Sequence, residues 1–76
     1  MMPYVSKNQH EILDQLFDFI QKYMVEHGYS PSFDEIAENC HLSRSSVVHY
    51  LSRLEIQGRI RREFGKARSI VIMKND

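Results

Sequence analysis

Helix start and stop signals constrain the fold of this chain more than any other feature of its sequence. Capping-box patterns, in which a serine is followed three residues later by Gln or Glu, begin at Ser6 and Ser32. Ser43 is a third candidate for the cap at a helix start, and Gly28 and Gly58 suit the position just past a helix end. These signals predict three helices, over about residues 7–27, 33–40 and 44–57.

The hydrophobic pattern agrees with three helices and adds a β-hairpin after them. Apolar side chains recur at helical spacing in the first segment, at Ile12, Leu13, Leu16, Phe17, Ile20, Tyr23 and Met24. After Gly58 the period changes, and residues 59–64 and 69–73 read as strands around the loop 65–68. Arg62 falls on the apolar face of its strand, which predicts an edge strand whose guanidinium reaches water. The residue before Pro31 favours extended geometry, which allows a very short strand over residues 29–31.

Length and composition restrict the class of protein. A chain of 76 residues is enough for one small domain, residues 1–76, and leaves little room for an enclosed active site. The longest apolar run, residues 70–73, is too short for a membrane span or a signal peptide. The single cysteine, Cys40, allows no internal disulfide and fits a reducing, cytoplasmic setting.

Charge is segregated along the chain. The ten basic and ten acidic residues cancel, but residues 1–40 hold two Lys against seven acids, a net of −5. Residues 41–76 hold eight basic residues against three acids, a net of +5. The neutral total therefore hides a basic half that would attract a polyanion, although chance scatter of charge is the plainer alternative in a short chain.

Residues 33–57 fit a helix-turn-helix unit. Ala37 is the small residue where the two helices would cross, and His41 occupies the turn position that requires positive φ, which histidine tolerates better than most residues. The apolar positions where the helices meet are Ile36, Cys40, Leu42, Val47 and Tyr50. With a hairpin directly after it, this unit predicts a small α+β winged helix-turn-helix fold of three helices followed by a β-hairpin wing.

The outward face of the third segment carries the candidate DNA contacts. Small polar side chains would let a recognition helix over residues 44–57 sit deep in the major groove, where Ser and His can hydrogen-bond to base edges and Val can contact a thymine methyl group. The candidate base-contacting residues are Ser45, Ser46, Val48 and His49. Candidates for the DNA backbone, including the wing over residues 59–73, are Ser32, Ser43, Arg44, Ser52, Arg53, Lys66 and Arg68. An ordinary solvated helix face is the alternative.

The ordered set of these motifs resembles the N-terminal DNA-binding domain of LexA-type SOS repressors over residues 6–72. The matching stretches are residues 9–13 (QHEIL), 26–32 (EHGYSPS), 34–37 (DEIA), 45–55 (SSVVHYLSRLE), 58–62 (GRIRR) and 68–70 (RSI). The resemblance implies a sequence-specific transcriptional repressor that binds double-stranded DNA. The turn before the recognition helix is one residue shorter than the family pattern and lacks its glycine. LexA-type repressors continue into a self-cleaving peptidase domain that also dimerises them, and the sequence given stops at Asp76. The resemblance therefore implies neither self-cleavage nor damage sensing.

An enzymatic role finds no support in the sequence. The four histidines are dispersed, only Cys40 and His41 are adjacent, and no second pair stands at metal-ligand spacing. A glycine-rich phosphate loop is also missing. We therefore expect no catalysis, no metal, no cofactor and no small-molecule ligand.

The stronger alternative is a winged helix that binds a protein and no DNA, for which the acidic outer face of the first helix would suit a basic partner. The hairpin argues against it, because an interaction module has no reason to place basic residues beside a small-residue helix face; these are Arg59, Arg61, Arg62, Lys66 and Arg68. One winged helix reads only a few base pairs. We therefore expect a monomer or weak dimer in solution that pairs as a homodimer on an inverted repeat.

Overall fold

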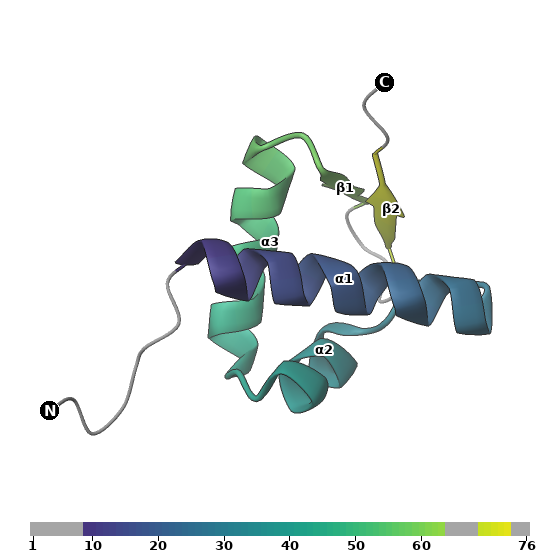
Figure 1. Cartoon of the computed structure of the whole chain (residues 1–76), viewed down its shortest axis with the longest axis horizontal. Coiled ribbons are helices and arrows are strands. Elements are labelled where there is room, and N and C mark those ends of the chain that lie inside the picture. The colour runs from purple at the N-terminus through teal and green to yellow at the C-terminus, as the bar shows by residue number, and fades with distance from the viewer. Residues whose placement is uncertain (1–8, 64–68, 74–76) are drawn as a thin grey trace, which may run out of the picture.

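The computed structural model describes residues 9–63 and 69–73 and contains three helices followed by a hairpin (Figure 1). The elements in chain order are α1 (Gln9–His27), α2 (Phe33–Cys40), α3 (Arg44–Ile56), β1 (Ile60–Arg62) and β2 (Ile70–Ile72). The strands pair antiparallel, with Arg61 opposite Val71 at the centre. This architecture confirms the predicted α+β winged helix-turn-helix. The predicted helix start at Lys7 and its Ser6 cap lie outside the described residues.

The serine and glycine signals act where the sequence places them. At the start of α2, the Ser32 N–H donates to Glu35 Oε1 at 2.8 Å and the Glu35 N–H donates to Ser32 Oγ at 3.2 Å, which completes the capping box. Ser43 caps α3, and Gly58 follows the helix with a φ of 78° that turns the chain toward β1. α3 ends at Ile56, one residue earlier than predicted, because Gln57 takes the cap position.

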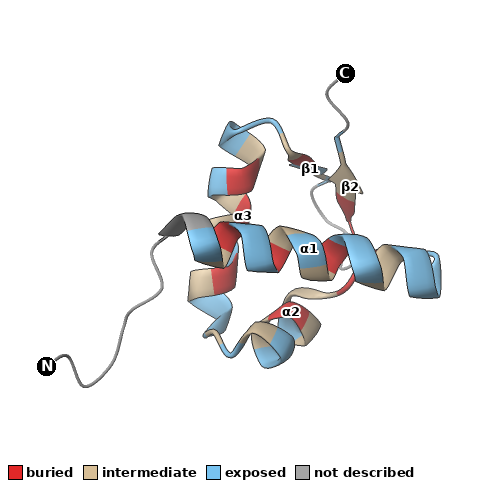
Figure 2. Cartoon of the chain, viewed as in Figure 1, coloured by how far each residue is buried: buried red, intermediate tan, exposed pale blue. Residues whose placement is uncertain are grey.

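The core lies between α1 and the other four elements (Figure 2). Leu13, Leu16 and Ile20 of α1 are buried against Ile36, Val47, Leu51, Leu54, Ile60 and Ile70. Every helix and both strands therefore supply at least one buried side chain. Because Ile60 and Ile70 belong to this core, the hairpin is anchored to the helices at the start of each strand.

Residues 29–31 do not form the very short strand that Pro31 suggested. Instead Ser30 is buried, and its Oγ accepts a hydrogen bond from the Ile70 N–H at 3.3 Å. Pro31 is also buried and has no N–H with which to extend a ladder. A side-chain hydroxyl thus holds this segment against β2 in place of backbone pairing. Among the described residues, no helix is long and apolar enough to cross a membrane.

Candidate nucleic-acid interface

The turn between α2 and α3 depends on a single left-handed residue. His41 has φ 57° and ψ 46°, and its N–H donates to the carbonyl of Ala37, as does the N–H of Leu42 at 2.9 Å. These bonds satisfy a carbonyl that the end of α2 would otherwise leave open. The prediction that His41 occupies the positive-φ position of the turn is confirmed, and α3 begins three residues later at Arg44.

One side of α3 is fixed by the core, and this exposes the opposite side. Val47, Leu51 and Leu54 are completely buried. On the other side Ser45 and His49 are exposed, Val48 is 38 % exposed, and Ser46 is half-buried. The four candidate base-contacting residues are therefore brought together on one outward surface, which we call the reading face. Since the buried side of α3 packs against α1, the reading face points away from α1.

The first turn of α3 is rich in hydroxyl groups that contact one another. Ser43 Oγ accepts a hydrogen bond from the Ser46 N–H at 3.1 Å, donates to Ser46 Oγ at 3.0 Å, and lies 3.2 Å from Ser45 Oγ. Ser43 and Ser32 thus both serve as helix caps. The positive end of the helix dipole, which favours an anion, lies at each of these two sites.

The arginines of the described chain differ sharply in their surroundings. Arg44 Nη1 lies 3.0 Å from Asp34 Oδ1, and both side chains are exposed. Arg59 Nη1 lies 3.2 Å from Asp14 Oδ1 of α1, and its guanidinium stacks 4.3 Å from the centroid of the Phe17 ring. Arg53, by contrast, is exposed, and its side chain makes no hydrogen bond or ion pair with any described residue.

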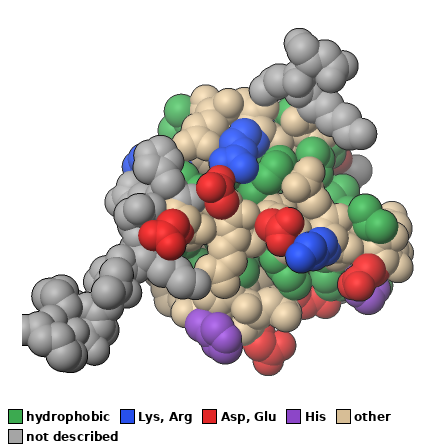
Figure 3. Space-filling view, viewed as in Figure 1, with side chains coloured by type: hydrophobic (Ala, Val, Ile, Leu, Met, Phe, Trp, Pro, Cys, Tyr) green, Lys and Arg blue, Asp and Glu red, His purple; other side chains and the backbone are tan. Residues whose placement is uncertain are grey.

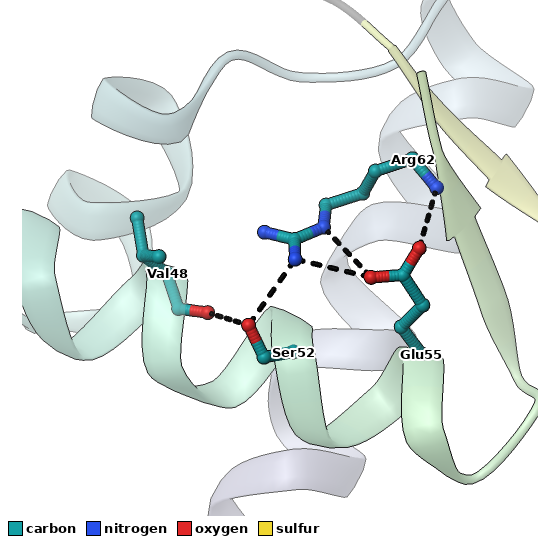
Figure 4. Close-up of polar contacts among 4 residues, drawn as sticks. All are labelled: Val48, Ser52, Glu55 and Arg62. Atoms are coloured by element: carbon teal, nitrogen blue, oxygen red, sulfur yellow. Dashed lines mark hydrogen bonds and ion pairs between the residues drawn. The ribbon is translucent and has the colours of Figure 1, made fainter. Parts of the chain in front are cut away.

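The sequence predicts that the guanidinium of Arg62 reaches water from an edge strand. The structure shows instead that it does not. Its side chain is only 18 % exposed and folds back onto α3, where Nε and Nη2 donate to Glu55 Oε1 at 3.3 and 3.0 Å (Figure 4). Nη2 also donates to Ser52 Oγ at 3.1 Å. The strand is indeed at an edge, but α3 lies beside it and offers a carboxylate, so an ion pair replaces water. Glu55 was missed because nothing in the sequence singles out this acid.

Ser52 was predicted to contact the DNA backbone, and its hydroxyl already has two partners. It accepts from Arg62 and donates to the carbonyl of Val48 at 3.0 Å. A hydroxyl has one proton to donate. In this arrangement Ser52 therefore has none left for a phosphate oxygen.

The basic residues of the hairpin differ in whether acids of the protein already hold them. Arg59 and Arg62 are held by acids of α1 and α3, whereas Arg61 is exposed. The wing candidates Lys66 and Arg68 lie outside the described residues. Figure 3 shows the opposite surface, the face of α1, where acidic side chains predominate over lysine and arginine. The acidic surface and the reading face are thus on different sides of the domain.

Metal binding and thiol chemistry are the remaining features to compare with the structure. Within residues 9–63 and 69–73 there is no group of three or more His, Cys, Asp or Glu residues that could hold a metal ion. Cys40 is a half-buried thiol outside any disulfide, and it packs against the core.

A helix-turn-helix pair with an outward reading face, followed directly by a hairpin, defines a winged-helix DNA-binding domain. Comparison with known families agrees, since residues 2–69 match the LexA DNA binding domain. The chain belongs to this family.

Three relatives called LexA repressor illustrate the match. The protein of Geobacillus sp. (strain WCH70) is 46 % identical over 76 residues, which cover 99 % of this chain and 35 % of the relative. That of Caldicellulosiruptor saccharolyticus is 43 % identical over 77 residues, or 100 % and 36 % of the two chains. That of Koribacter versatilis is 41 % identical over 61 residues, or 79 % and 29 %. The chain thus spans about a third of the length of these curated relatives.

Proposed function

We propose that this chain is a sequence-specific repressor of transcription that binds double-stranded DNA in the cytoplasm and blocks a promoter by occupying it. The observation that carries the proposal is the reading face of α3, a surface of small, uncharged side chains on a helix whose other side is locked into the core. Such a surface fits the major groove closely. Membership of the LexA DNA binding domain family and the repressor names of the relatives support the same function.

In this proposal the side chains have two kinds of role. Ser45, Ser46, Val48 and His49 read base edges, and Arg53 contacts a phosphate. The N-termini of α2 and α3, capped by Ser32 and Ser43, direct backbone N–H groups at phosphates, with Arg44 beside them. The wing, through Lys66 and Arg68, lies on the backbone or in the adjacent minor groove. Phosphate contacts set affinity and position, whereas base contacts set sequence preference.

Selection of binding sites from random duplex DNA tests this proposal. The wild-type chain should enrich a motif, and His49→Ala should change the preference at one base pair by about 1–3 kcal/mol. Arg53→Ala is the matched control, because loss of a phosphate contact should weaken all sequences about equally. An unchanged motif for His49→Ala would place the recognition surface elsewhere.

The dependence of binding on salt separates DNA from a protein partner. If one domain neutralises roughly three to five phosphates, the slope of log K against log salt should be about −3 to −4.5. Affinity that stays flat between low and physiological salt would instead favour the interaction-module alternative. The observation behind that alternative is the acidic, exposed face of α1.

We also propose that two copies pair on an inverted repeat. A module of this size covers about 600–1,000 Å² on DNA, too little to single out one site, and two copies on half-sites about one helical turn apart would double the contact. Gel-shift titration on single and paired half-sites, with sedimentation of the free protein, tests this. Equal affinity for both duplexes, or a tight dimer without DNA, would contradict it.

A further inference from the structure

A chain of hydrogen bonds joins the hairpin to the reading face of α3. Arg62 of β1 donates to Glu55 and Ser52 of α3, and Ser52 in turn donates to the carbonyl of Val48, one of the four reading residues (Figure 4). The links measure 3.0, 3.1 and 3.0 Å. We call the Arg62 and Glu55 pair, with Ser52, the wing clamp.

The wing clamp binds both the side chain and the backbone of Arg62. While Glu55 Oε1 accepts from the guanidinium, Glu55 Oε2 lies 3.4 Å from the Arg62 backbone nitrogen and accepts from its N–H. In the register of the hairpin that N–H points away from β2, on an edge of β1 that no other strand of the described residues covers. One carboxylate therefore satisfies the open edge of the strand as well as the charge beside it.

The clamp adds a further attachment to α3 for a hairpin that the core holds through Ile60 and Ile70. Each strand has three residues, and an isolated two-stranded hairpin is marginally stable in water. Ile60 anchors the start of β1 in the core and Ile70 anchors the start of β2, whereas Arg62, which pairs with Ile70 at the end of β1, is attached to α3 through its own side chain. At 18 % and 37 % exposure, the two charged side chains are shielded enough to interact more strongly than a surface pair.

We propose that Glu55 and Arg62 are positioning residues for DNA recognition. They fix the wing relative to α3, so that wing and reading face meet one duplex in a single geometry. Arg62 acts within the protein and leaves phosphate contact to other arginines. This inference rests on the proposed DNA-binding function and adds to it the side-chain contacts that couple the wing to α3.

The test compares Glu55→Gln and Arg62→Lys with the wild type on two duplexes, the motif recovered by selection and a random sequence of equal length. Glu26→Gln is the matched control, since it removes the same charge from an exposed position of α1. Circular dichroism and thermal unfolding set a temperature at which every variant is fully folded. Both clamp variants should bind the selected duplex about tenfold more weakly, the size of effect seen between side chains in contact, and the random duplex unchanged within about twofold.

Three other outcomes would overturn the proposal. If Arg62 contacts phosphate, Glu55→Gln frees it and strengthens binding to both duplexes, and Arg62→Lys changes little because lysine keeps the charge. If the pair only stabilises the fold, both variants unfold at lower temperature but bind both duplexes normally once folded. If the wild type selects no motif at all, the proposed function itself fails. If the wild type selects a motif and both variants bind that motif normally, only the proposal about the wing clamp fails.

Discussion

Replacing the turn histidine with glycine should stabilise this domain. His41 adopts φ 57° and ψ 46°, a region that costs a residue with a Cβ about 1–2 kcal/mol and costs glycine almost nothing. Glycine gains freedom in the unfolded chain, which offsets about 0.4–1 kcal/mol of that difference. The His41 ring is exposed, so its removal sacrifices no burial. His41→Gly should therefore raise the free energy of unfolding by about 0.5–1 kcal/mol and Tm by about 2–8 °C.

Thermal and urea unfolding followed by circular dichroism measure this effect. His41→Ala is the first control, because it removes the ring but keeps the Cβ and should give no stabilisation. Gln21→Gly is the second, since glycine at an exposed position inside α1 should cost about 1 kcal/mol. If His41→Gly were neutral or destabilising while Gln21→Gly behaved as expected, the left-handed conformation of His41 would not lower the stability of the domain.

Three further predictions concern the core, a cap and the charges. Leu51→Ala, at a fully buried site of α3, should cost about 2–5 kcal/mol in urea unfolding, and a cost below about 1 kcal/mol would contradict the packing of α3. Ser32→Ala breaks the capping box of α2 and should cost about 1 kcal/mol in the same assay, whereas no loss would mean that the cap is dispensable. Arg53→Ala should reduce the salt slope of DNA binding by about 0.9, and Arg59→Ala, whose charge is held by Asp14, should leave the slope unchanged; equal effects would refute the distinction.

The fold was predictable because its signals are local. The caps at Ser32 and Ser43 and the glycines at 28 and 58 act through the adjacent backbone, so their consequences can be derived from neighbouring residues alone. The left-handed turn at His41 was predictable for the same reason. The short strand allowed over residues 29–31 depended instead on a partner far away in the sequence, and in the structure this segment meets β2 through the Ser30 hydroxyl, which accepts from the N–H of Ile70, forty residues away.

The candidate site was predictable in its outline but not in its charges. A helical wheel is enough to separate the core side of α3 from its reading face, because burial follows the 3.6-residue period. Whether an arginine faces solvent depends on which acid lies nearby in three dimensions. Arg62 meets Glu55 only because the chain reverses at Gly58, and Arg59 meets Asp14 only because α1 packs beside the start of β1.

The internal ion pairs determine how much of the positive charge of residues 41–76 can contact DNA. Five arginines lie between residues 44 and 62, and three of them have carboxylate partners at 3.0–3.2 Å. Arg62 and Glu55 are partly shielded together, and Arg59, although its partner Asp14 is exposed, is itself partly buried against the Phe17 ring, so moving either arginine to a phosphate would break contacts within the protein. Arg44 and Asp34 are exposed, and such a pair is weak enough for Arg44 to exchange its partner for a phosphate. Of these five arginines, we therefore expect DNA to meet Arg53, Arg61 and Arg44, which together contribute about −2.7 to the salt slope before any contribution from Lys66 and Arg68 of the wing.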